Sequence, residues 1–265
     1  MRNNRLLWGL ILLIIGVLLL LQNLGLLSIN IWGLLWPLFL ILLGAFMIWG
    51  LTSRRRPSET RQLSIPAGSA QEAVVSFHHG AGKLYVSAGL PSSEILSGQF
   101  EGGVVEDVQQ NGPSTLVRLS APTENMVFPP FGPGSYGYSW DCKLNPDIPM
   151  TLEFRTGASE SDLDLSGVKA TSVRLETGAS STRLVLPANA GLTRASISAG
   201  AASLKVEVPD STAAHIRVKS GLSGINIDTR RFPMTGDGYE STDYPSEINR
   251  AEIDIEAGVG SISVR

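Results

Sequence analysis

An uncharged stretch near the N-terminus constrains this 265-residue chain more than any other feature of its sequence. From Leu6 to Ser53 the 48 residues include no Asp, Glu, Lys or Arg. One α-helix needs about 20 apolar residues to cross a bilayer, so a run of this length predicts two crossings. A polar break separates its two apolar halves. We therefore expect a transmembrane helical hairpin over residues 1–53, with helices near 6–22 and 31–51.

Basic residues flank this stretch at its two outer ends and are absent between its halves. Lys and Arg favour the cytoplasmic side of a membrane, so these residues set the topology. They are Arg2, Arg5, Arg54, Arg55 and Arg56. A cleaved signal peptide is disfavoured, because a second apolar run follows the first and no small-residue cleavage site lies between them. The sequence predicts a multi-pass protein of the cell membrane, with a basic linker at residues 54–61 and both termini in the cytoplasm.

The remainder, residues 62–265, is long enough for one domain with a substantial core. It carries 15 Lys and Arg against 23 Asp and Glu, a net charge of about −8. This balance disfavours nucleic acid and anionic lipid as partners of the domain. Its single cysteine, Cys142, cannot form a disulfide within the chain, which suits a reducing compartment.

Six segments of this domain repeat one pattern, in which alternating residues surround a glycine, as in LEFRTGASESDLDL and VRLETGASSTRLVL. The central glycines are Gly80, Gly157, Gly178, Gly200, Gly221 and Gly258. From the second to the fifth, successive glycines are 21, 22 and 21 residues apart, and the last step is 37. A fixed period of this length is typical of stacked units, none of which buries its apolar face alone.

Within each unit, large apolar residues stand three positions before the glycine and six after it, and small residues adjoin it. Alternation of this kind predicts two strands joined by a glycine-centred turn at a crowded corner. The fold class we expect is a transmembrane hairpin followed by an all-β domain, a repetitive β-solenoid-like stack of strand-turn-strand units.

The outward positions of neighbouring units carry charges of opposite sign, a pattern independent of the glycines and apolar residues that define the repeat. If the units stack in register, opposite charges meet and favour that register. The predicted pairs are Glu153 with Arg174, Arg155 with Glu176, Asp162 with Arg183, Arg217 with Asp254, and Lys219 with Glu256.

Two regions interrupt the repeat. Residues 95–120 resemble ordinary antiparallel strands with Gly-containing turns, and residues 121–149 are rich in Pro, Gly and aromatic residues. The aromatic residues of the second region are Phe128, Phe131, Tyr136, Tyr138 and Trp140. We expect them to form a loop that caps one end of the stack, as solenoids require, or that docks a protein partner.

No group of residues in the sequence predicts catalysis, a cofactor or a metal site. His78 and His79 are adjacent on a strand and therefore face opposite sides, so they do not share one ion, with or without His215. A run of carboxylates could suggest calcium or glycoside hydrolysis, but the alternation places it on a solvated face. That run is Glu160, Asp162 and Asp164. No motif pairs Cys142 with a histidine as a nucleophile.

Two parts of the chain resemble a known bacterial family. The segments GLILLIIGVLLLLQNLGLL and WPLFLILLGAFMIWG resemble the paired helices of the LiaI–LiaF-like transmembrane region. The stretch that begins WDCKLNPDIPMTLEFRTGAS resembles the "toastrack" β-domain of LiaF-like proteins. The resemblance implies a role in cell-envelope stress, in which such proteins restrain a membrane histidine kinase until wall-active antibiotics disturb the envelope. The archetype has four membrane helices, whereas two are expected here.

These observations together predict a non-enzymatic, membrane-anchored interaction module that senses or regulates envelope stress. Its expected partners are the bilayer and a protein, either a membrane histidine kinase or a related envelope-stress membrane protein, and self-association is open. One alternative is a surface-exposed adhesin or polysaccharide-binding β-solenoid, which the basic residues after the second helix disfavour. Another is a β-helix polysaccharide lyase or hydrolase, which would need acidic and basic groups gathered in one groove.

Overall fold

A computed structural model of the chain describes residues 36–45, except 38 and 42, together with residues 60–122 and 138–265. The chain divides into two compact units. The first comprises Met1–Arg56 and Val127–Ser135, and the second comprises Pro57–Met126 and Tyr136–Arg265. The topology-setting arginines and the predicted helix at 6–22 lie outside the described residues.

In the first unit, the described residues between 36 and 45 are helical, and the rings of Trp36 and Phe39 stack with centroids 6.0 Å apart. They fall inside the predicted helix at 31–51. No described helix has the length and apolar character that a membrane crossing needs.

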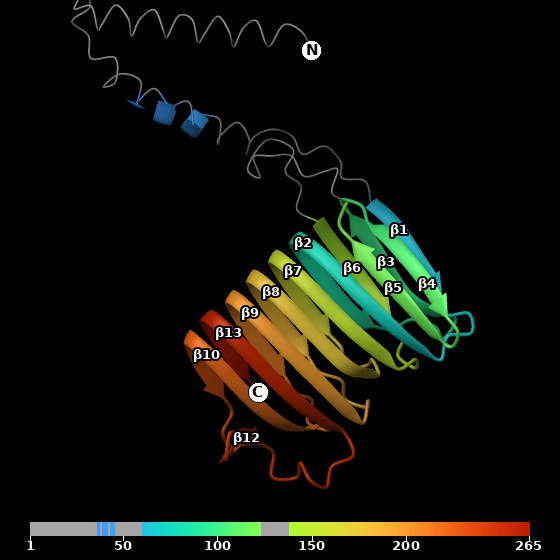
Figure 1. Cartoon of the computed structure of the whole chain (residues 1–265), viewed down its shortest axis with the longest axis vertical. Helices are drawn as coiled ribbons and strands as arrows, with labels where there is room; N and C mark the ends of the chain where they lie inside the picture. The colour runs from blue at the N-terminus through green and yellow to red at the C-terminus, as the bar shows by residue number, and fades with distance from the viewer. Residues whose placement is uncertain (1–35, 38, 42, 46–59, 123–137) are drawn as a thin grey trace, which may run out of the picture. The chain divides into compact units, whose positions relative to one another are not determined.

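The second unit is built from β-strands, and its described residues contain no helix (Figure 1). The strands that precede the regular repeat are β1 (Thr60–Pro66), β2 (Glu72–Ala88), β3 (Glu94–Glu101), β4 (Val105–Asn111), β5 (Ser114–Ser120) and β6 (Tyr138–Leu144). Those that follow are β7 (Met150–Asp164), β8 (Ala170–Val185), β9 (Leu192–Glu207), β10 (Ala213–Ile227), β11 (Met234–Thr235), β12 (Gly238–Glu240) and β13 (Arg250–Val264). Strand β1 begins at Thr60, so the sheet includes the last residues of the segment interpreted as a linker.

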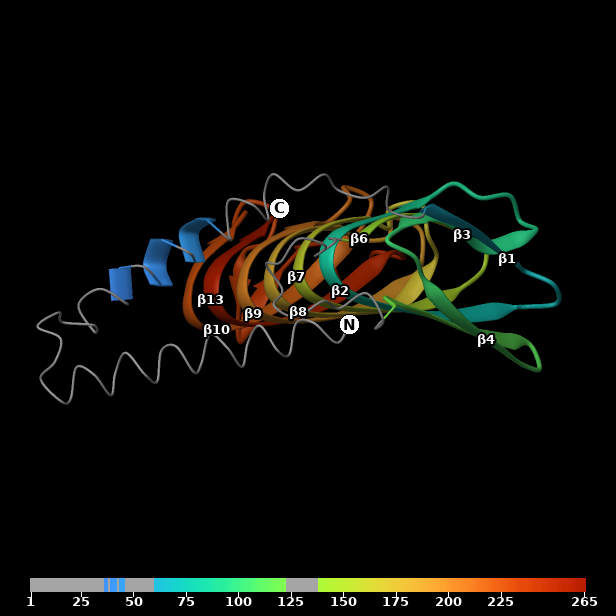
Figure 2. The same ribbon diagram turned by 90° about the horizontal axis from the view of Figure 1, so that it is seen from above.

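Six long parallel strands form the body of this unit in the order β2-β7-β8-β9-β13-β10 (Figures 1 and 2). Each neighbouring pair is in register along both arms of the strand, so Phe154 lies beside Leu175 and Leu163 beside Leu184. The expectation of an all-β domain with units stacked in register is confirmed.

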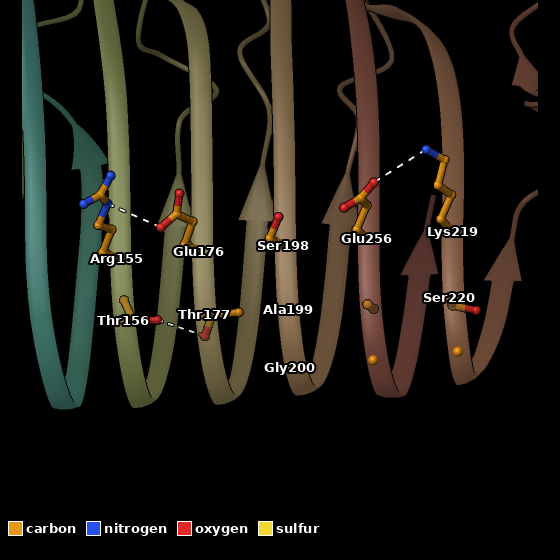
Figure 3. Close-up of a pocket in the computed structure, with 13 residues that line it drawn as sticks. Arg155, Thr156, Glu176, Thr177, Ser198, Ala199, Gly200, Lys219, Ser220 and Glu256 are labelled. Carbon is orange, nitrogen blue, oxygen red and sulfur yellow. Dashed lines mark hydrogen bonds and ion pairs between the residues drawn. The ribbon is translucent and has the colours of Figure 1, made fainter.

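The repeat unit differs from the predicted strand-turn-strand. Each copy is one continuous strand of 15 to 17 residues that bends at its glycine, without a turn (Figure 3). None of the six corner glycines has a positive φ. Because parallel neighbours bend at the same position, ladder hydrogen bonds continue on both sides of the corner and hold it without turn geometry.

The order of the strands also differs from sequence order, because β13 lies between β9 and β10. The charges give a physical reason. At the two outward positions nearest the corner, β9 has the uncharged Ser196 and Ser198, whereas β13 places Asp254 beside Arg217 and Glu256 beside Lys219 of β10. Opposite charges across neighbouring strands favour this arrangement over direct pairing of β9 with β10.

The core lies between the two arms of the bent strands. Inward residues three positions before each glycine are buried from β2 through β13, and the rings of Phe77 and Phe154 stack with centroids 5.1 Å apart. At the β2 end, β5 and β6 pair in parallel with the two arms of β2. Strands β4 and β5 form the expected antiparallel hairpin, and β3 pairs antiparallel with β1 and β6.

Candidate functional site

The outer face of the first arm, beside the corner, forms an open groove of about 910 Å³ (Figure 3). Its outer wall is a row of side chains, one from each strand of β7, β8, β9, β13 and β10. In that order they are Arg155, Glu176, Ser198, Glu256 and Lys219. The in-register stack aligns them because each stands two residues before its glycine.

Neighbouring charges in this face are paired as the sequence predicts. Arg155 Nε lies 3.4 Å from Glu176 Oε2, and Lys219 Nζ lies 3.6 Å from Glu256 Oε1 (Figure 3). These side chains are about half or more exposed, so each pair contributes only about 0.2–1 kcal/mol. The row therefore carries two pairs of opposite charges on either side of Ser198, and its net charge is zero.

Two other predicted pairs, Arg217 with Asp254 and Asp162 with Arg183, form closer contacts. The predicted pair of Glu153 with Arg174 does not form. Arg217 donates from Nε to Asp254 Oδ1 at 2.7 Å and from Nη2 to Oδ2 at 3.2 Å. This two-point contact lowers the pKa of Asp254. Glu153 stands opposite Arg174 in the ladder, but it accepts a hydrogen bond from Ser76 Oγ at 3.2 Å instead.

The second arm carries a cluster of charges centred on Glu207. Arg183 Nε lies 3.1 Å from the Glu207 carboxylate, Lys205 Nζ 3.0 Å and Arg265 2.6 Å. Arg183 also meets Asp162 at 3.0 Å, as predicted. Hydrogen bonds from Arg183 lower the pKa of Glu207 from its ordinary value of 4.5 to about 2, against the effect of burial. Glu207 therefore stays ionised throughout the physiological range. The sequence pattern did not identify this cluster, because Arg265, the residue after β13, is distant in sequence from Glu207.

The three histidines do not gather at one site. His78 and His79 occupy opposite faces of β2, and His215 of β10 pairs with Glu240, with Nδ1 2.8 Å from the carboxylate. His79 is 1% exposed, and burial lowers its pKa to about 4, an effect that the backbone of Tyr138 partly opposes. It is therefore neutral at pH 7. Within the described part of the chain, no three His, Cys, Asp or Glu side chains are grouped to hold a metal ion.

Two of the five aromatic residues expected in a loop lie instead on strand β6. Trp140 is fully buried, its ring 5.3 Å from Phe100 and 5.0 Å from His79 between centroids. Its Nε1 donates to the Gly103 carbonyl at 3.3 Å, and the Tyr138 hydroxyl donates to the Pro122 carbonyl at 2.9 Å. These two rings close the core beyond β2 and offer little surface to a partner. Phe128, Phe131 and Tyr136 lie outside the described residues.

Cys142 follows on the same strand and is fully buried. Burial raises the pKa of its thiol far above the usual range. A protonated thiol with no access to solvent is a structural residue in this fold.

The corner glycines form a column of close backbone contacts. A Cβ on Gly157 would lie 2.5 Å from the Gly80 carbonyl oxygen, and one on Gly178 would lie 3.0 Å from that of Gly157. The same relation continues through Gly200, Gly258 and Gly221. The residue that opens the column, Gly80, has free space at this position. The crowded corner is thus produced by one strand packing on the next, which requires glycine without requiring a positive φ.

Comparison with known proteins agrees with this architecture. Residues 3–60 match the model of the LiaF transmembrane domain. Residues 54–207 match the model of the N-terminal domain of toast_rack, DUF2154, a match that covers more than half of the chain and ends with β9. No curated protein matches the chain.

Two solved structures also resemble the chain. The first is a candidate cell adhesion protein from Clostridium sporogenes, with 20% identity and a TM-score of 0.70 over 78% of this chain and 98% of the other. A candidate adhesin from Bacteroides fragilis matches at 9% identity and a TM-score of 0.30, over 80% and 99% of the two chains. The first likeness shows a shared fold, and the second is too distant to support an argument. The chain belongs to the toast-rack family, and a LiaF transmembrane domain precedes its β-domain.

Proposed function

We propose that this protein is a membrane-anchored, non-enzymatic interaction module that regulates the response to cell-envelope stress through protein contacts. The observation that carries the proposal is the direct succession of the two family matches. The LiaF transmembrane match ends at residue 60, where β1 begins. We expect a rearrangement in the membrane region to pass along the backbone to the first strand of the sheet, because only residues 52–59 separate the predicted second helix from β1.

The paired outer charges support a binding role for the β-domain. Among the described strands, exposed carboxylates such as Glu176 and Asp254 lie beside cationic side chains. The pKa values of Glu207 and Asp254 are lowered. General acid catalysis uses a carboxyl group with a raised pKa. The partner we propose is a membrane histidine kinase or a related envelope-stress membrane protein, which the paired charges would contact in a fixed register.

Removal of the β-domain tests this proposal. A strain that lacks the gene would carry either the full chain or a chain ended after Arg61, and a reporter of envelope stress would follow treatment with a cell-wall antibiotic. We expect the basal level or the induction of the reporter in the strain with the truncated chain to differ from that in the strain with the full chain. A second variant, Arg155→Glu with Glu176→Arg, reverses the ion pair without removing it. It tests whether the charges of the outer face are needed while the domain stays folded. Reporter behaviour identical to that of the full chain in the truncated strain would contradict the proposal.

Sidedness separates this function from surface binding. Cys142 is buried, so an added cysteine is needed, and Ser92 lies exposed in the connection between β2 and β3. We expect a membrane-impermeant thiol reagent to label Ser92→Cys only after lysis, because the basic residues after the second predicted helix favour a cytoplasmic β-domain. The unaltered chain is the control and should remain unlabelled in both conditions. Labelling of Ser92→Cys in intact cells would instead support an adhesin or polysaccharide-binding module.

A further inference from the structure

The two ends of the parallel stack are finished differently. At the β2 end, both arms of the first strand have a further neighbour, since β5 pairs with Glu72–His78 and β6 with Gly82–Ala88. At the other end, β10 pairs with β13 along its whole length, but only His215 and Ile216 pair with β12 on its outer side. Among the described residues, no strand pairs with the outer side of residues 217–227. We refer to this segment as the open edge (Figure 1).

The open edge has few of the features that prevent strands from associating. Its last eight residues, SGLSGINI, contain neither charge nor proline. Natural sheets usually protect an edge with charges, proline, bulges or a covering segment. Strand β4, at the opposite end, has Glu106 and Asp107, and Arg61 of β1 contacts Glu106. The open edge therefore has the character of a strand that is covered by another.

Two apolar residues of the open edge, Leu222 and Ile225, are more exposed than the residues at the same positions of the neighbouring strands. Ile225 belongs to the inward column in which Ile262 and Leu204 are 1% and 2% exposed, yet Ile225 is 45% exposed. The position after the corner glycine is alanine in β2, β7, β8 and β9, but it is Val259 in β13, 55% exposed, and Leu222 in β10, 81% exposed. Around the corner of β10 the core thus ends without a cover, whereas Ile216 and Ile227 near the two ends of the strand are 0% and 9% exposed.

We propose that the open edge binds the open edge of a second copy of this chain, and that the two copies form an antiparallel pair about a two-fold axis. Each strand bends at its glycine into two arms, and an axis along the bisector of the bend places the first arm of one copy on the second arm of the other. Inward side chains then meet inward side chains when Ser220 stands opposite Ser223 of the second copy. In that register Val218 stands opposite Ile225, and the two apolar residues cover one another.

Charge and topology both favour this occupant. In the same register Arg217 faces Asn226 and Lys219 faces Gly224, so no like charges meet across the axis. Asp254 and Glu256 of β13 already neutralise the two cations. Head-to-tail growth is blocked because β5 and β6 cover the other end of the stack. Head-to-head association therefore closes after two copies, as an isologous interface does.

The mass of the full chain in detergent tests the proposal. The unaltered 28.3 kDa chain should have a protein mass twice that of the monomer. Ile225→Lys places a charge in the proposed interface and should halve the mass. The matched control is Val259→Lys, since Val259 is 55% exposed but lies on β13, which has neighbours on both sides; it should remain dimeric. A monomeric unaltered chain, or a dimeric Ile225→Lys chain, would overturn the proposal.

Disulfide trapping tests the register without relying on a disruptive variant. Two full-length copies of different size, one with Val218→Cys and the other with Ile225→Cys, would be mixed in detergent and oxidised. We expect a cross-linked product of the two unlike copies. In the control, the second copy has Gly224→Cys in place of Ile225→Cys, so its thiol lies on the opposite face of the strand. The yield of the cross-linked product should then fall severalfold. Equal yields, or preferential linking of like copies, would exclude this pairing.

Discussion

Replacing Trp140 with alanine is expected to lower the free energy of unfolding of the β-domain by about 3–5 kcal/mol, the usual cost of truncating a fully buried tryptophan. The indole is 0% exposed and packs edge-on against Phe100 and His79. It also donates to the Gly103 carbonyl, which would lose this partner. Denaturant unfolding of the full chain in detergent, followed by the far-ultraviolet circular dichroism of the strands, measures the change.

Two other variants separate the contributions of the ring. Trp140→Phe keeps most of the apolar volume and loses the indole N–H, so we expect a smaller loss, with about 1 kcal/mol from the hydrogen bond. Tyr85→Ala truncates an aromatic residue that is 37% exposed on the neighbouring strand β2, and should cost less than Trp140→Ala. An equal effect of Tyr85→Ala and Trp140→Ala would show that β6 does not close the core as described.

Gly157→Ala is expected to destabilise the domain by about 1–3 kcal/mol, the range for forcing extra volume into a packed site. The added Cβ would lie 2.5 Å from the Gly80 carbonyl oxygen, and both atoms belong to backbones fixed by ladder hydrogen bonds. The two strands would have to separate at the corner. Thermal or chemical unfolding of the full chain reports the loss.

Gly80→Ala is the matched control for this substitution. The chemical change is the same and the residue occupies the same corner, but no atom lies within 4 Å of the added Cβ. Alanine also restricts the unfolded chain, so this variant should be neutral or more stable by up to about 1 kcal/mol. If both variants lost the same stability, the cause would be a general need for glycine flexibility, and the stacking contact would be excluded.

The sequence was sufficient to predict the columns of the stack. The alternation around Gly157 and Gly178 established which residues face inward, and opposite charges at Arg155 and Glu176 established the register. The continuous bend was not predictable from this pattern, because a glycine between two alternating segments has the same spacing in a turn and in a bent strand. What distinguishes them is the neighbouring strand, whose position the pattern does not give.

The candidate site was predictable to a smaller extent. Tyr138 and Trp140 lie in a segment rich in Pro and Gly, whose composition favours a loop, yet pairing with β2 and β3 makes it a strand. Tertiary contacts outweighed local propensity there. The open edge had no signal of its own in the sequence, because the alanine after the corner glycine is replaced both in β10, by Leu222, and in β13, by Val259. Its exposure follows from the position of β13 in the sheet.

The insertion of β13 between β9 and β10 has a consequence for the order in which the domain is completed. During synthesis β10 emerges before β13, the one described strand that pairs with it along its whole length, since the 22 residues 228–249 separate the two strands in sequence. The edge of β9 then offers β10 a pairing with the same 21-residue period as the earlier steps. That pairing must be avoided or undone before β13 can enter. The slowest step of folding is therefore expected at this end of the stack, where a non-local strand displaces a local one.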